Sequence, residues 1–152
     1  MFGAMPSDNE LELHRQLHQG QEKYAYFLLA AAASGIALAV RVTSNATLHW
    51  SLIPLGLAVC SWGLSFYYGC RYIGYRHSTI YANAALFRVQ RGDDPEVGSH
   101  PQLIQAASEG IRNAMETNNK TIMQLGKRQF QYLVAGAVLF VGWHVLGIVL
   151  RG

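Results

Sequence analysis

The chain has 152 residues, of which 51% are hydrophobic and 14% carry a charge, and its formal net charge is +3. Soluble domains carry charge on about a quarter of their residues, so the composition argues against an ordinary soluble domain. The small net charge argues against a nucleic-acid partner. Long stretches contain no charge at all, which is typical of segments that face lipid. The composition therefore predicts an all-α integral membrane protein.

Residues 1–23 are predicted to form an N-terminal helix. A capping box at residues 7–10 (Ser-Asp-Asn-Glu) marks its start, because the serine and glutamate side chains can each accept a hydrogen bond from a free backbone N–H. His14 and His18 follow at a spacing of four residues. Such a pair shares one helix face and can bind a metal ion. A solvated polar face explains the same pattern, so we expect no metal there.

Two long apolar segments follow, at residues 24–42 and 50–72. Each contains the ~20 residues that a helix needs to cross ~30 Å of hydrocarbon. Tyrosine, tryptophan and phenylalanine cluster near their ends, as is typical of side chains at a membrane interface. Because the connection between the segments is short, residues 24–72 are predicted to form a transmembrane hairpin.

Small residues recur every four positions along both of these segments. They are Ala31, Gly35 and Ala39 in the first segment, and Ser61, Ser65 and Gly69 in the second. Small side chains let helix backbones approach closely, which is a main source of helix association in lipid. We therefore expect helix-packing faces here. The spacing does not distinguish contacts within the chain from contacts between copies.

Residues 73–128 are predicted to form a cytoplasmic helical hairpin, with a turn at 91–99 where glycine and proline break the helical pattern. Ser99 is the expected N-cap of its second helix. In that helix, apolar residues recur at spacings of three and four, which predicts a coiled-coil seam. The seam comprises Ile104, Ala107, Ile111, Ala114, Asn118, Ile122 and Leu125. Asn118 is its one amide, and a buried asparagine can set the register of such a seam.

Residues 129–152 are predicted to form the third transmembrane helix and a short external C-terminus. Lysine and arginine are concentrated between the second and third apolar segments, which predicts that this part faces the cytoplasm. The protein is then expected in the inner (plasma) membrane, with a cytoplasmic N-terminus. Four basic residues are expected to contact anionic lipid headgroups at the inner interface. They are Arg71, Arg76, Lys127 and Arg128.

Two histidines lie at similar expected depths in the outer half of the membrane. His49 precedes the second apolar segment, and His144 lies within the third. A pair of imidazoles can ligate a haem iron or another metal. The simpler interpretation is a neutral His144 that is hydrogen-bonded between helices, and we therefore expect no bound cofactor.

The sequence contains no phosphate-binding loop, no nucleophile elbow and no other specific catalytic motif. We therefore expect a non-enzymatic, oligomeric membrane protein, with a pore- or channel-forming effector as the first hypothesis. The alternative is an accessory or scaffold subunit of a larger membrane complex. A third hypothesis is a redox or quinone-linked protein that uses His49 and His144. A small membrane unit with protruding helices resembles the general plan of pore-forming effectors and accessory subunits.

Overall fold

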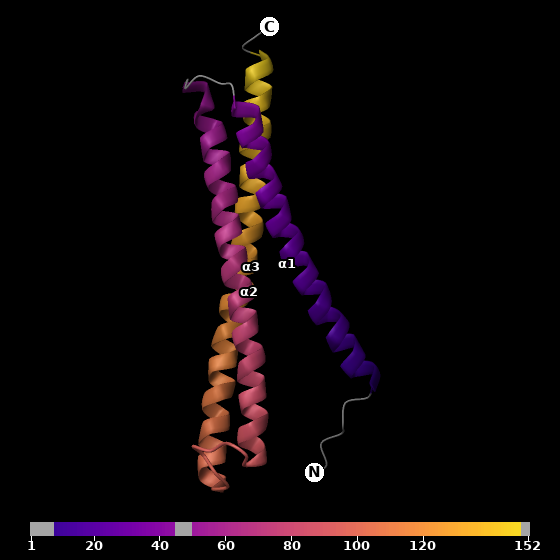
Figure 1. Ribbon diagram of the computed structural model, residues 1–152, viewed down its shortest axis with the longest axis vertical. Helices are drawn as coiled ribbons and strands as arrows, with labels where there is room; N and C mark the ends of the chain where they lie inside the picture. Colours follow the sequence, from indigo (N-terminus) through magenta and orange to yellow (C-terminus); the bar gives the residue numbers. More distant parts are fainter. Residues whose placement is uncertain (1–7, 45–49, 150–152) are drawn as a thin grey trace.

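The computed structural model describes the backbone of residues 8–44 and 50–149, and the side chains of residues 20–44 and 50–149. Its regular structure is helical throughout these ranges (Figure 1). The elements are α1 (Asp8–Thr43), a short 3-10 helix η1 (Trp50–Leu52), α2 (Ile53–Arg91) and α3 (Pro101–Val149). Among the described residues, three helical segments are long and apolar enough to cross a membrane, namely Gly20–Thr43, Trp50–Arg91 and Pro101–Val149. The prediction of an all-helical chain with three helices of this length and apolarity is confirmed.

Each long helix continues well beyond the length that a bilayer requires. At about 1.5 Å per residue, the 49 residues of α3 extend roughly 73 Å, more than twice the ~30 Å thickness of hydrocarbon. The 39 residues of α2 extend roughly 58 Å by the same measure. Large parts of both helices must therefore lie outside the hydrocarbon if the apolar parts lie within it.

The three helices pack unequally on one another. Figure 1 shows α2 and α3 running antiparallel and side by side, whereas α1 diverges from them toward its N-terminus. Among the described side chains of α1, the buried ones are Ala25, Leu28, Ala32 and Ala39, all within its apolar part. The three helices pack as one bundle along their apolar parts, and the remainder of α2 and α3 forms a protruding pair.

The contact face of α3 in this protruding pair differs in part from the predicted seam. Ser108 is buried and Met115 is half-buried, whereas Ala114 is exposed. The prediction for Ala114 was wrong because it followed the apolar side chains. Spacings of four and three residues from Ile104 lead through positions 108, 111, 115, 118, 122 and 125, and the helix presents this row to α2 even though one member is a serine.

The turn between α2 and α3 stops the first helix sharply. Gly92 has φ 74° and ψ 14°, in the left-handed region, and its N–H donates to the carbonyl of Val89 at 3.0 Å. The N–H of Asp93 donates a hydrogen bond to the backbone carbonyl of Arg88 at 3.1 Å, which completes a Schellman motif. The carboxylate of Asp94 then accepts a hydrogen bond from the N–H of Glu96 at 3.0 Å. The first two hydrogen bonds satisfy carbonyls that the end of α2 leaves free, and the third stabilises the turn that follows.

The second helix of this pair begins one residue later than the predicted cap implies. Pro101 is the first residue of α3, and the carbonyl of His100 accepts a hydrogen bond from Ile104 at 3.0 Å. His100, and not Ser99, therefore precedes the helix. Proline suits the first helical position because the N–H that it lacks would have no partner there. The capping box at residues 7–10 begins at Ser7, which lies outside the described residues.

Replacing Gly92 by alanine is expected to lower the free energy of unfolding by about 1 kcal/mol, because a Cβ disfavours the left-handed conformation. Gly110→Ala is the matched control, since a Cβ at Gly110 meets nothing within 4 Å and alanine favours the helix. Both variants can be compared in detergent by denaturant-induced loss of helical circular dichroism. Equal effects of the two substitutions would contradict the assigned role of Gly92.

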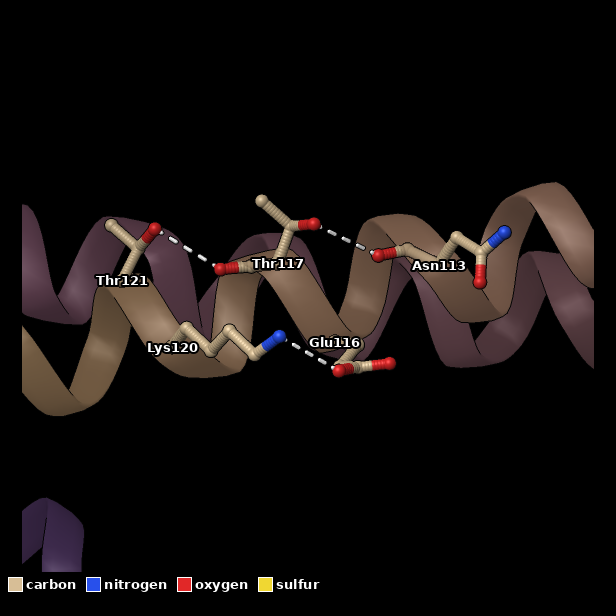
Figure 2. A network of polar contacts seen from close by, with 5 residues as sticks. All are labelled: Asn113, Glu116, Thr117, Lys120 and Thr121. Carbon is tan, nitrogen blue, oxygen red and sulfur yellow. Dashed lines mark hydrogen bonds and ion pairs between the residues drawn. The ribbon is translucent and has the colours of Figure 1, made fainter.

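The exposed side of α3 carries polar contacts in its protruding part (Figure 2). Lys120 Nζ lies 2.8 Å from Glu116 Oε1, and the two side chains are 67% and 68% exposed. The Lys120 ammonium holds the pKa of the Glu116 carboxyl below its ordinary value. The hydroxyls of Thr117 and Thr121 each donate to the carbonyl four residues earlier, at 3.1 Å. An exposed ion pair of this kind suits water and not hydrocarbon.

Candidate functional site

Trp62 of α2 fills the centre of the three-helix bundle. Its indole is 5% exposed and lies against Gly35 of α1 and Gly136 of α3. A Cβ on Gly35 would lie 2.8 Å from the indole, and a Cβ on Gly136 would lie 2.5 Å from it. Trp62 Nε1 donates a hydrogen bond to the carbonyl of Leu133 at 3.2 Å. The two glycines therefore make room for a large ring, and its polar group has a partner.

A polar contact joins all three helices nearby. Ser65 and Gln129 are 0% and 1% exposed, respectively. Ser65 Oγ donates a hydrogen bond to the backbone carbonyl of Gln129 at 2.8 Å. Gln129 Nε2 in turn donates to the carbonyl of Ala25 at 3.5 Å, a long hydrogen bond. Gly69 leaves space for this amide, because a Cβ there would lie 2.5 Å from Gln129 Nε2. Since such groups are costly to bury without partners, this contact favours one register of the three helices.

The small residues singled out in the sequence are distributed unevenly around this centre. Gly35, Ser65 and Gly69 contact Trp62 or Gln129, and Ala39 belongs to the buried core cluster around Trp62. The remaining small residues, Ala31 and Ser61, are half-buried. Asn118, which belongs to the predicted seam in the protruding pair, is half-buried there. The structure thus brings Gly35, Ala39, Ser65 and Gly69 together within a single copy.

Trp62 and Gln129 were not among the sequence-predicted site residues. Gln129 lies four residues after Leu125 and four before Leu133, so helical spacing places it on the face that these leucines share. This spacing could have identified Gln129 as a buried residue from the sequence alone. For Trp62 the indication of burial was weaker, because a tryptophan in an apolar segment can face lipid as readily as protein.

Arginine side chains are held by tyrosines near the inner end of the predicted second span. The Arg71 guanidinium donates to the hydroxyls of Tyr67 at 3.3 Å and Tyr75 at 3.1 Å. It also lies 5.5 Å from the centre of the Tyr75 ring. Hydroxyls one turn before and one turn after Arg71 therefore fix its direction along the surface of α2.

A second cation contacts the same group of aromatic rings from α3. The guanidinium of Arg128 lies 5.8 Å from the centre of the Tyr68 ring, which is within the range of a cation–π contact. Tyr68 stacks on Tyr132 of α3, with ring centres 5.4 Å apart and an angle of 7° between the planes. Tyr67 meets Tyr68 edge-on at 5.6 Å. Arg71 and Arg128 are thus linked through one aromatic cluster that bridges α2 and α3.

Arg76 has a different environment from Arg71 and Arg128. Its Nη1 donates to Gln21 Oε1 of α1 at 2.8 Å and to the Tyr72 hydroxyl at 3.3 Å. Its guanidinium lies 6.0 Å from the centre of the Tyr72 ring. Arg76 therefore ties α1 to α2, while Lys127, the fourth basic residue of the predicted set, is exposed on α3.

The predicted histidine sites are placed as follows. His144 is exposed on α3 beside Trp143, with ring centres 6.4 Å apart, and it forms no hydrogen bond to the described residues. The expectation of an imidazole hydrogen-bonded between helices is therefore not met within that part of the chain. His49 lies outside the described residues, and so do the side chains of His14 and His18. Among the described side chains, no group of three or more histidine, cysteine or acidic residues can hold a metal ion.

The fold and this site define an all-helical protein with three candidate membrane-spanning helices and a glycine-lined tryptophan at its centre. Two arginines, one from α2 and one from α3, form cation–π contacts with tyrosines near the inner end of the predicted second span. Comparison with protein-family models, with curated proteins and with solved structures finds no match to the chain. The function is therefore argued from the geometry.

Proposed function

We propose that this chain is a non-enzymatic membrane protein that acts as a subunit of an assembly of its own copies. The observation that carries the proposal is the filled interior of the bundle, where Trp62 lies between Gly35 and Gly136. An indole in this position closes the space among the three helices. A path or a binding surface at membrane depth must then lie on the outside of the bundle, where copies or lipids meet.

The outer face of α3 suits contact with another helix. Within its most apolar part, α3 buries 6% of its residues, whereas α1 and α2 each bury 22%. Exposed residues recur along this face at alternating spacings of four and three, which is the pattern of helices that pack as in coiled coils. They are Phe130, Val134, Ala137, Val141, His144 and Ile148.

His144 favours a second copy of this chain as the partner of that face. An ionisable side chain is costly when it faces hydrocarbon, so such residues generally face another protein surface or water. A neutral imidazole carries one donor and one acceptor. Copies with the same orientation in the membrane bring His144 to the same depth, so two imidazoles can pair across a twofold axis.

An assembly of this kind acts as a pore- or channel-forming effector if the outer faces of its copies surround a transport path. The polar groups of Ser65 and Gln129 are buried inside each copy, so they do not contribute to such a lumen. An accessory or scaffold subunit is the second candidate. The uncovered face of α3 would then bind a different membrane protein. The redox hypothesis ranks third, because it requires His49 and His144 to meet.

The proposed topology follows the distribution of basic residues. The protruding parts of α2 and α3 carry Arg88, Arg91, Arg112 and Lys120, and positively charged connections remain in the cytoplasm. We therefore place this pair and the N-terminus in the cytoplasm, the C-terminus outside, and the protein in the inner membrane. Cysteine labelling of intact cells with an impermeant reagent, at positions 97 and 151, tests this orientation.

The assembly is tested by the mass of the full-length protein extracted from native membranes in a mild detergent. The expected result is a multiple of the 16.8 kDa subunit mass. A single copy together with one different protein would favour the accessory role. A single copy alone would refute both candidates.

Replacing His144 by phenylalanine is expected to weaken self-association about fivefold, since one interhelical hydrogen bond in a membrane contributes roughly 1 kcal/mol. Leu146→Phe is the matched control, because Leu146 is 53% exposed and lies on another side of α3. Energy transfer between donor- and acceptor-labelled copies in lipid vesicles gives the association constant. If the two phenylalanine variants associate equally, the face that contains His144 is not the contact between copies.

A further inference from the structure

We propose that Arg71 and Arg128, together with the tyrosines that hold them, form a binding site for the phosphate of an anionic phospholipid on the joint surface of α2 and α3. The site is defined by one guanidinium from each helix and by the aromatic cluster of Tyr67 and Tyr68 between them. The inference is independent of the proposed self-association, because it concerns a surface within one copy.

Tyrosines orient both cations of the site. Tyr67 and Tyr75 each take one hydrogen bond from Arg71, at 3.3 Å and 3.1 Å. A guanidinium has five N–H donors, so three remain for a ligand. Arg128 is positioned over the ring of Tyr68 at 5.8 Å. A tyrosine hydroxyl or ring orients a guanidinium without neutralising it, and oriented guanidinium groups are the ones that bind phosphate well.

The positive charge of the site is not compensated by any described carboxylate. Arg71 and Arg128 are exposed and form no ion pair within the described part of the chain, and the same is true of the neighbouring Lys127. By contrast, Lys120 in the protruding part is paired with Glu116 at 2.8 Å. Three positive charges without a carboxylate partner favour an anion from outside the protein.

Exposed leucines on the same face of α2 indicate that the anion is part of a lipid. Leu64 and Leu57 lie seven and fourteen residues before Arg71, so they lie on its face of α2, about 10 Å and 21 Å further along the helix. Both are exposed, at 43% and 54%. An apolar strip that begins at the guanidinium suits a molecule with a phosphate at one end and an acyl chain at the other. A soluble phosphate would leave this strip without a partner.

The structure also separates these residues from Arg76, which the sequence places in the same set. Arg76 donates to Gln21 of α1 and to Tyr72. It serves the packing of α1 against α2, and we assign it no lipid. The site is therefore specific to one side of the α2–α3 pair and is not a uniform ring of basic residues around the protein.

The test compares the affinity of the full-length protein in detergent for phosphatidylglycerol and for phosphatidylcholine, measured by native mass spectrometry during lipid titration. The wild-type protein is expected to prefer phosphatidylglycerol. The double variant Arg71→Gln/Arg128→Gln is expected to lose at least fivefold in its affinity for phosphatidylglycerol, because one basic residue near the surface contributes about that factor. Its affinity for phosphatidylcholine is expected to change less than twofold.

The matched control is Arg91→Gln/Arg112→Gln. It also removes two positive charges, but from exposed positions on the protruding parts of α2 and α3. It is expected to bind both lipids as the wild type does. The proposal is overturned if the control loses as much affinity as the test variant, or if the test variant keeps the wild-type preference. Displacement of the lipid by soluble glycerol phosphate at equal concentration would also overturn it, since the acyl chain would then contribute nothing.

A second variant keeps the proposal testable if the arginine substitutions impair folding. Tyr67→Phe/Tyr75→Phe retains both charges and both rings but removes the hydroxyls that accept hydrogen bonds from Arg71. It is expected to lower the affinity for phosphatidylglycerol about twofold to fivefold, with unchanged helical content. An affinity equal to that of the wild type would mean that the tyrosines do not position Arg71 for the ligand.

Discussion

Replacing Gly136 by alanine is expected to lower the free energy of unfolding by about 1–3 kcal/mol, the usual cost of an extra methyl group in a filled interior. The new Cβ would lie 2.5 Å from the indole of Trp62. The indole cannot retreat, because Gly35 contacts it from α1, where a Cβ would lie 2.8 Å away. The helices must therefore separate, and the hydrogen bond from Trp62 to Leu133 lengthens or breaks.

Gly142→Ala is the matched control on the same helix, because a Cβ there meets nothing within 4 Å. Alanine also has the higher helix propensity, so this variant is expected to be as stable as the wild type or slightly more stable. Thermal unfolding in detergent, followed by near-ultraviolet circular dichroism of the tryptophans, compares the two. If both glycine variants unfold at the same temperature, the close approach of α3 to Trp62 does not contribute to stability.

Replacing Trp62 by alanine is expected to have the larger effect, a loss of about 3 kcal/mol in the free energy of unfolding. The substitution empties the space between Gly35 and Gly136, and glycines have no side chains with which to fill it. In a membrane the loss comes from packing contacts, since the surrounding lipid is as apolar as the interior. The N–H that donates to the Leu133 carbonyl is lost as well.

Trp50→Ala provides the control for this second prediction. Trp50 precedes α2 in the same chain but is 83% exposed, so its removal is expected to change the free energy of unfolding by less than about 0.5 kcal/mol. Reversible unfolding in mixed detergent micelles measures both variants. A comparable loss for the two tryptophans would show that the filled interior is not the main source of stability. The proposal that function lies on the outer surfaces would then lose its main support.

These two predictions bear on function because they concern the same structural feature. The proposed self-association and lipid binding both lie on the outside of a bundle whose centre is occupied by an indole, on the α3 face that contains His144 and on the aromatic cluster around Arg71 and Arg128. Variants of the outer surface are therefore expected to alter association or lipid binding with little change in stability. Variants of Trp62 or Gly136 are expected to alter stability first.

The sequence by itself determined the helical architecture and the approximate extent of the apolar segments. Uncharged stretches of about twenty residues become helices in lipid because a helix satisfies every backbone group within the segment. The turn between α2 and α3 was equally readable, since Gly92 adopts a backbone conformation that disfavours other residues. The apolar helices follow from the properties of lipid as a solvent, and the turn follows from the local conformation of a glycine. Neither feature depends on neighbouring helices.

Only the tertiary structure decided which side of each helix faces inward. In water, an apolar side chain indicates the interior, but in a membrane lipid and protein interior are equally apolar, so hydrophobicity does not separate them. For this reason Trp62 was overlooked, and His144 is exposed where a contact between helices was expected. In the protruding pair, the prediction for Ala114 was wrong for a different reason, because it followed the apolar side chains and not the row that contains Ser108. Close packing and hydrogen bonding choose the inward faces here, and they depend on partners from other helices, such as Gln129 for Ser65 and Gln21 for Arg76.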